Sequence, residues 1–138
     1  MAGMFDVSFV EEDSLLVGRL RGTLDAAVAR KLVEFVELRE AEVEKGFNRF
    51  CDLTQLERIN LSVDEIASLA ARRRAYNPNP IRVKSAFLVS SPLALGVVYM
   101  FKALLQSERI EVRWFDSLEV AAAWLQVSPG TLTRRSVA

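Results

Sequence analysis

The chain has 138 residues, of which 51% are apolar and 26% charged, as in a globular domain with a real core and unlike a disordered segment. Its 18 Lys and Arg residues balance 18 Asp and Glu residues, so no overall positive charge argues for a nucleic-acid partner. Histidine is absent, which excludes zinc sites and Ser-His or Cys-His nucleophile pairs within a single chain.

The absence of several sequence features indicates the cellular compartment of the protein. Cys51 is the single cysteine, so no intramolecular disulfide can form, and this fits a reducing interior. Residues 1–13 have neither the basic start nor the apolar run of a secretion signal. The most apolar segment, Pro92–Phe101, is too short to span a membrane. We therefore expect a soluble, cytoplasmic protein with no membrane insertion, no metal and no cofactor.

The first part of the chain predicts a hairpin and a helix. Alternating apolar residues predict strands at Met4–Val10 and Ser14–Leu20. Residues 22–25 (Gly-Thr-Leu-Asp) then break the second strand, and Thr23 or Asp25 can cap the following helix. That helix is expected over Asp25–Lys45, with Gly46 as its stop.

A strand, a polar connection and a second helix follow. The strand is predicted at Phe47–Leu53, with Phe50 and Cys51 on opposite faces, so that both faces of the sheet are covered. Ser62 and Glu65 have the spacing of a capping box, which predicts a helix over Val63–Tyr76. The Asn-Pro-Asn-Pro run at 77–80 predicts a loop.

The rest of the chain repeats the alternation of strands and helices. Strands are expected at Arg82–Val89 and Ile110–Phe115, and helices at Pro92–Gln106 and Ser117–Leu125, the last capped by Asp116. The whole pattern predicts an α/β fold: an N-terminal hairpin and then βαβαβα, giving a five-stranded, mostly parallel sheet with about four helices. Residues 1–126 form a single domain in this interpretation, and 127–138 a flexible C-terminal tail.

The helix predicted at Pro92–Gln106 is apolar on nearly all sides. Its core stripe is expected to be Leu93, Val97, Met100 and Leu104. The other side offers an interaction surface made of Leu95, Val98, Tyr99, Lys102 and Leu105. Self-association through this surface, as a homodimer, and simple burial remain equally open.

Three stretches carry a resemblance to a known family. They are Gly22–Ala26, Cys51–Thr54, and the closing run from Trp114–Glu119 to Ala123–Leu125. In this order and spacing, the chain resembles the STAS domains, the SpoIIAA-like (anti-sigma factor antagonist-like) group, over about Leu15–Leu125. The resemblance implies a sheet layered with helices and a non-enzymatic regulatory or scaffolding role through protein–protein contact. A regulatory kinase or an anti-sigma-like protein is the implied partner.

In signalling members of that family a serine at the start of the second helix is phosphorylated, within an Asp-Ser-Ser-Gly-Leu motif. The motif falls here on Asn60–Asp64, where Ser62 alone is kept, so the acceptor motif is degenerate. Ser62, Asn60 and Thr54 are the candidate phosphoacceptor or anion site. The capping-box spacing favours Ser62 as a helix cap over a phosphoacceptor.

Other polar groups have similar competing interpretations. A group of polar residues should lie together at one edge of the sheet: Thr54, Asn60, Thr23, Asp25, Asp52, Ser90, Ser91 and Asp116. They could form a crevice for an anion or metabolite, or they could be ordinary helix caps and strand ends. Arg72–Arg74, with Arg82 and Lys84, form a basic patch that is best explained as a solvated face. Cys51 is expected to be an inert apolar side chain.

The sequence thus predicts a STAS-like domain that acts through protein contact. The alternative is a SpoIIAA-like carrier of a small molecule or lipid, which fits the apolar third helix. An enzyme is the least favoured class, because there is no histidine, no glycine-rich phosphate loop and no nucleophile elbow.

Overall fold

A five-stranded sheet with the order β1-β2-β3-β4-β5 forms the centre of the molecule in the computed structural model, which describes residues 5–76 and 81–134. The first pair of strands is antiparallel and the other three pairs are parallel. This confirms the predicted hairpin and mostly parallel α/β sheet. The strands are β1 (Phe5–Val10), β2 (Leu15–Asp25), β3 (Asn48–Asn60), β4 (Val83–Leu88) and β5 (Ile110–Phe115).

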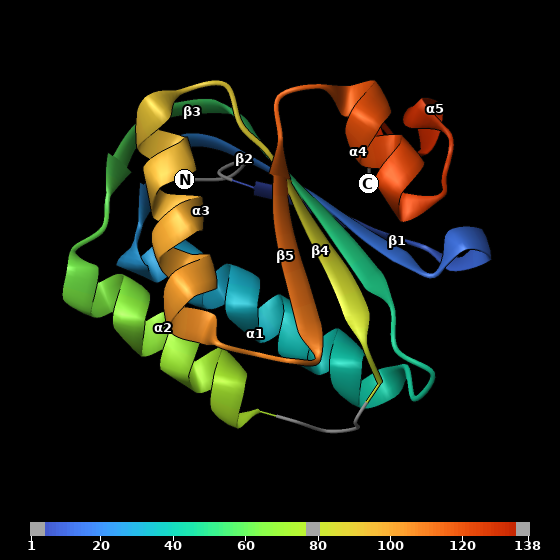
Figure 1. Ribbon diagram of the computed structural model, residues 1–138, viewed down its shortest axis with the longest axis horizontal. Coiled ribbons are helices and arrows are strands. Elements are labelled where there is room, and N and C mark those ends of the chain that lie inside the picture. The colour runs from blue at the N-terminus through green and yellow to red at the C-terminus, as the bar shows by residue number, and fades with distance from the viewer. Residues whose placement is uncertain (1–4, 77–80, 135–138) are drawn as a thin grey trace.

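The helices divide unequally between the two faces of the sheet (Figure 1). Three of them connect successive parallel strands, and because each strand is added on the same side of the last, crossovers of one hand place these helices on one face. They are α1 (Ala26–Glu42), α2 (Val63–Ala75) and α3 (Pro92–Leu105). The short helices α4 (Leu118–Leu125) and α5 (Pro129–Leu132) cover the other face. A single 3-10 turn, Glu11–Asp13, joins β1 to β2.

Side chains of β3 alternate between two cores. Cys51 and Leu53 belong to the core under α1–α3, whereas Phe50 belongs to the core under α4 and α5. The prediction that both faces of this strand are covered is confirmed.

Strands β2 and β3 are both longer than predicted. β2 runs through residues 22–25, where a break was expected, and β3 continues past Leu53 to Asn60. The two extensions pair with each other, from Arg21 with Gln55 to Asp25 with Asn60. One register irregularity precedes this span, between Arg19 and Arg21, and one lies within it, between Gly22 and Thr23. Each extension looks like a loop on its own because it is polar; pairing with the other one satisfies its backbone groups.

The segment from Val127, predicted to be a flexible tail, is folded as far as Arg134. Thr131 and Leu132 are buried against the second core. The guanidinium of Arg19, on β2, donates hydrogen bonds of 2.9 Å to the carbonyls of Leu132 and Arg134. The prediction was wrong because α1–α3 all lie on one face, and the other face needs this segment as cover.

Two smaller predictions also change. The buried face of α3 consists of Ala94, Val98 and Leu105, while Leu93, expected in the core, is 59% exposed. The cap of α4 is Ser117 and not Asp116. The predicted loop at 77–80 lies outside the described residues.

Replacement by alanine should change the stability in opposite directions at two glycines. A Cβ on Gly96, within α3, meets nothing within 4 Å, so Gly96→Ala should raise the free energy of unfolding by about 0.5–1 kcal/mol through helix propensity. Gly46 has φ +77° and a Cβ there would lie 2.9 Å from Ile81 Cγ2, so Gly46→Ala should destabilise by more than about 1 kcal/mol. Urea denaturation of both variants measures the difference; equal effects would contradict the described backbone.

Candidate functional site

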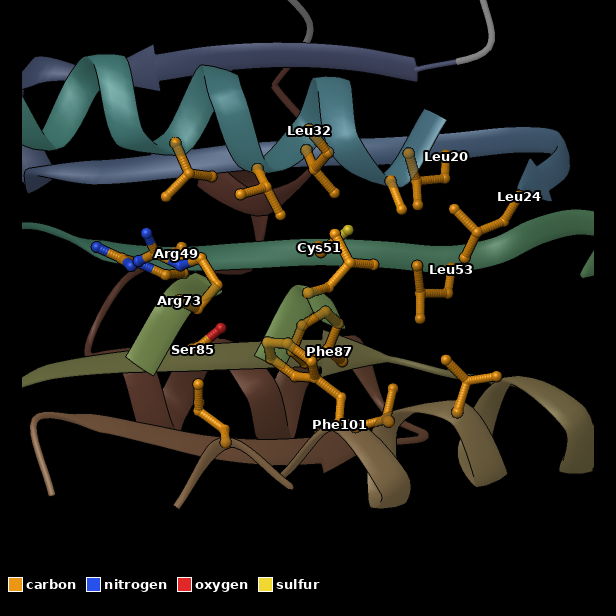
Figure 2. Close-up of a pocket in the computed structure, with 18 of the residues that line it drawn as sticks. Leu20, Leu24, Leu32, Arg49, Cys51, Leu53, Arg73, Ser85, Phe87 and Phe101 are labelled. Atoms are coloured by element: carbon orange, nitrogen blue, oxygen red, sulfur yellow. The ribbon is translucent and has the colours of Figure 1, made fainter. Parts of the chain in front are cut away.

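A cavity of about 170 Å³ lies between the sheet and the α1–α3 layer (Figure 2). Its lining comes from β2, β3 and all three helices and is mostly aliphatic or aromatic. Among the described lining residues, only Arg49, Arg73 and Ser85 carry polar side-chain atoms, apart from the Cys51 thiol. Figure 2 shows Arg49, Arg73 and Ser85 at one end of the pocket and Leu24 and Leu53 at the other.

Small side chains leave this space open. On β2, Gly18 stands between Leu16 and Leu20, and all three line the cavity. A Cβ on Gly18 would have its nearest neighbour, the Phe50 carbonyl, at 3.8 Å, which is ordinary contact. A larger side chain is therefore sterically possible at this position, and its absence contributes to the cavity.

The polar end is a cluster of ionic groups around Glu40 on α1, which is 5% exposed. Arg73, on α2, makes a two-pronged contact with this carboxylate at 2.8 and 2.7 Å. Arg49, on β3, donates to Glu40 at 3.0 Å, and Arg109, just before β5, lies 3.8 Å away. Paired and hydrogen-bonded charges of this kind are the form in which ions are tolerated in a protein interior.

The cluster carries an excess of positive charge. Glu37 adds a second carboxylate, 3.3 Å from Arg73 and 2.7 Å from Arg72, so four guanidinium groups share two carboxylates. Burial lowers the pKa of Arg49 to about 10 against the opposing charge of Glu40. Burial likewise lowers the pKa of Arg109. In both cases desolvation is the largest cause, and the neighbouring Arg73 guanidinium lowers the pKa further.

One donor of this cluster has no acceptor in the described part of the chain. Arg49 is 9% exposed; its Nη1 binds Glu40 and its Nη2 binds the Phe47 carbonyl at 3.1 Å. Its Nε has no hydrogen-bond partner among the described residues. A buried unsatisfied donor of a charged group is costly, and here it belongs to a residue that lines the cavity.

Part of the Glu40 cluster lies at the protein surface. Arg73 and Arg109 line an open groove together with Arg74 and Arg82. Arg73 lines both this groove and the cavity, so the two spaces lie on either side of one side chain.

The predicted site of Ser62, Asn60 and Thr54 is not one site. Thr54 and Asn60 lie on the same continuous strand, six positions and about 20 Å apart. Ser62 is the N-cap of α2: its hydroxyl accepts from the Glu65 amide at 3.1 Å, and the Glu65 carboxylate accepts from the Ser62 amide at 2.8 Å. The capping box is therefore confirmed.

The wider set of polar groups serves mainly local turns and caps, although Asp25 and Asn60 are register partners on β2 and β3. Asp52 accepts from the amide and hydroxyl of Thr54 at 2.8 and 2.6 Å, and Asp25 caps α1. Ser91 caps α3 in the same way. These groups serve local turns and helix ends, because β3 extends through the place where the crevice was expected.

The predicted interaction surface on α3 is divided between core and solvent. Val98 and Leu105 are buried, while Tyr99 is 54% exposed and Lys102 is also exposed. Tyr99 contacts Trp114 on β5, with ring centroids 6.2 Å apart. The exposed part of this surface is therefore Tyr99 and Lys102, and Tyr99 joins α3 to the edge strand through Trp114.

The basic patch at 72–74 is less uniform than predicted. Arg73 is buried in the Glu40 cluster, whereas Arg72 pairs with Glu37 and Arg74 donates to the Leu104 carbonyl at 2.6 Å. The cluster was missed because its members are far apart in sequence. The available signal was a single arginine, Arg49, inside an otherwise apolar strand.

Neither a thiol nucleophile nor a metal site is evident. Burial, with a smaller effect of the Asp52 charge, raises the pKa of Cys51 to about 12, so this thiol stays protonated at neutral pH. No group of three potential metal-binding His, Cys, Asp or Glu side chains occurs within residues 5–76 and 81–134. Within the same ranges, none of the helices has the length and apolar character needed to cross a membrane.

Comparison with known proteins identifies the fold. A crystal structure of an uncharacterised protein from the DUF3478 family with a SpoIIAA-like fold, from Shewanella loihica PV-4, superposes with a TM-score of 0.58. The superposition covers 88% of this chain and 91% of that chain at 15% sequence identity. No family model and no curated protein matches the sequence. The chain therefore has a SpoIIAA-like fold, as predicted, and the likeness at this identity concerns the fold alone.

Replacing Glu40 tests the cluster. Glu40→Gln leaves buried guanidinium groups without their shared anion and should lower the free energy of unfolding by about 3 kcal/mol or more. Burial raises the pKa of Glu40, but the hydrogen bonds and charges of Arg73 and Arg49 outweigh it and leave the pKa below its ordinary value of 4.5. The stabilisation is therefore present above that value and is lost as the pH falls through the folded-state pKa.

Chemical denaturation between neutral and acidic pH measures both effects. Glu40→Gln should lose stability at neutral pH and show a smaller decrease on acidification than the unmodified chain. The control is Glu44→Gln, an exposed position where the change should stay within about 0.5 kcal/mol. If Glu44→Gln and Glu40→Gln behaved alike, the Glu40 cluster would have no special role in stability.

Proposed function

We propose that this protein is a non-enzymatic binding protein that holds the apolar part of a small amphipathic anion in the cavity under α1–α3. The observation that carries the proposal is an apolar cavity lined at its polar end by Arg49, whose Nε has no hydrogen-bond partner among the described residues. This favours the carrier alternative over the protein-contact role that the family resemblance implies.

The volume sets the scale of the ligand. A well-packed domain has few voids larger than a water molecule, and an apolar cavity of roughly 150 Å³ accepts benzene. The cavity here, about 170 Å³, suits a short alkyl chain or a single ring. An apolar group bound there would gain dispersion contacts that the empty space does not provide.

The positive charge of the arginines determines which chemical group of a ligand would suit the polar end of the cavity. A carboxylate or phosphate beside Arg49 could accept from its free Nε and offset the excess of guanidinium groups around Glu40. Arg73, Arg74, Arg82 and Arg109 in the outer groove would attract such an anion toward the same end. A cation or a neutral polar group gains neither effect.

Three ligands with the same eight-carbon chain test this proposal. Octanoate should bind at least about tenfold more tightly than 1-octanol, because only the carboxylate compensates the arginines, and octylammonium should bind weakest. Titration calorimetry gives the affinities, and native mass spectrometry of the purified protein shows any molecule that is carried through purification. Equal affinity for octanoate and 1-octanol would remove the role of the arginines.

Filling the cavity provides the matched test. Gly18→Leu should abolish octanoate binding and keep or raise stability, since its side chain occupies the apolar space. Gly96→Ala is the control, because it also replaces a glycine but faces open space. If Gly18→Leu left octanoate binding intact, or no ligand bound at all, a function in this cavity would be ruled out.

A second candidate is the regulatory role through protein contact, with a kinase or an anti-sigma-like protein as partner. Val63 and Leu93, in the first turns of the neighbouring helices α2 and α3, are 60% and 59% exposed, which supports a contact surface there. Ser62 adjoins this surface, but its hydroxyl already serves the capping box.

Substitution of Ser62 separates a cap from a switch. Ser62→Ala should lower the free energy of unfolding by about 1 kcal/mol through loss of the cap. Incubation with candidate serine kinases should leave Ser62 unlabelled in phosphopeptide mapping by mass spectrometry. Stoichiometric phosphate on Ser62 would instead support the switch.

A further inference from the structure

The outer edge of β5 has no neighbouring strand among the described residues. β5 is the last strand of the sheet, and none of the described elements pairs with its far side. The carbonyls of Arg109 and Phe115 accept from Val83 and Val89 at 2.8 and 2.9 Å, so these groups point toward β4. Because successive residues of a strand alternate, the amides and carbonyls of Ile110, Val112 and Trp114 point outward.

This edge lacks several of the features that normally prevent pairing with another chain, although two of its six side chains, Glu111 and Arg113, are charged. Its six residues contain no proline and no lysine, and its register with β4 runs without a bulge from Ile110 to Phe115. Edge strands are usually protected by such features or by a covering helix or loop. An exposed regular edge is a ready template for another strand.

The sequence of the strand is complementary to itself. We propose that β5 pairs antiparallel with β5 of a second copy, around a two-fold axis at Val112, so that one sheet runs through both copies. Val112 then faces Val112, Ile110 faces Trp114, and Glu111 faces Arg113, twice by symmetry. The inference does not depend on a ligand in the cavity.

The charges select this register. Glu111 and Arg113 are 56% and 52% exposed and lie 3.4 Å apart within one chain. In the proposed pairing they occupy positions without mutual backbone hydrogen bonds, where facing side chains are closest. Sliding the second strand by two residues either way would place Glu111 opposite Glu111 or Arg113 opposite Arg113. Like charges directly opposite are unfavourable, so the neighbouring registers are disfavoured.

The exposed aromatic pair lies beside the same edge. Trp114 is 36% exposed, and it contacts Tyr99, which is 54% exposed. In the paired arrangement Trp114 would lie opposite Ile110 of the second copy and lose contact with water. Large apolar side chains on the surface next to an open strand edge fit an interface between copies.

Charge reversal tests the pairing at two half-exposed side chains. Glu111→Arg is the cleaner variant, because Arg113→Glu also removes the contact of the guanidinium with the Trp124 ring at 5.2 Å. Light scattering after size-exclusion chromatography should show a dimer for the unmodified chain. Glu111→Arg or Arg113→Glu alone should each weaken self-association about tenfold or more, because two like-charged pairs form per dimer. A mixture of the two single variants should form heterodimers in native mass spectrometry, and the double variant should dimerise again. Glu44→Arg, the same change at an exposed position away from β5, should have no effect.

Amide exchange identifies the edge itself. The Val112 and Trp114 amides should exchange at least tenfold more slowly in the unmodified chain than in Glu111→Arg. A monomer at the concentrations used for NMR would overturn the proposal. So would a Glu111→Arg variant that dimerises as tightly as the unmodified chain, since the copies would then meet through another surface.

Discussion

The Glu40 carboxylate is the point at which four parts of the chain depend on one another. It comes from α1 and is contacted by Arg49 of β3, Arg73 of α2 and Arg109 before β5. These elements could each slide along the sheet if only apolar side chains held them, because apolar contacts have little direction. Hydrogen bonds between charged groups do have direction, and they fix how the helical layer sits on the sheet. The cavity exists beside this fixed point.

The Glu40 contacts hold the helices in place, and this explains why the space beneath the helices is not completely filled. Ordinary cores shrink around a missing side chain and recover part of the lost contact. Here α1 and α2 are held at one end by the Glu40 contacts, so they cannot settle freely onto Gly18 and Cys51. An apolar space bounded by helices that are anchored in this way is suited to hold a guest molecule rather than to collapse.

Elements that are determined by neighbouring residues in the sequence were predicted correctly. The Ser62–Glu65 capping box and the bounds of β5 were predicted because propensity, periodicity and capping act over a few residues. The extensions of β2 and β3 were missed, since each is stabilised by the other. Arg49 and Glu40 were missed as functional candidates for the same reason, because the residues that they contact are distant in sequence. The fold was thus accessible from the sequence, and the candidate site was not.

The contacts of Arg19 bear on how the chain reaches its native state. Its hydrogen bond to the Leu132 carbonyl joins residues 113 positions apart, and the second core closes only when α4 and α5 dock. Contacts of such long range slow folding, because the intervening loop must be ordered first. Until they form, Val17 and Phe50 remain open to solvent on a sheet that also has a free β5 edge. A chain in which α4 and α5 were undocked would expose this apolar face, so the short helices after β5 protect the sheet against aggregation.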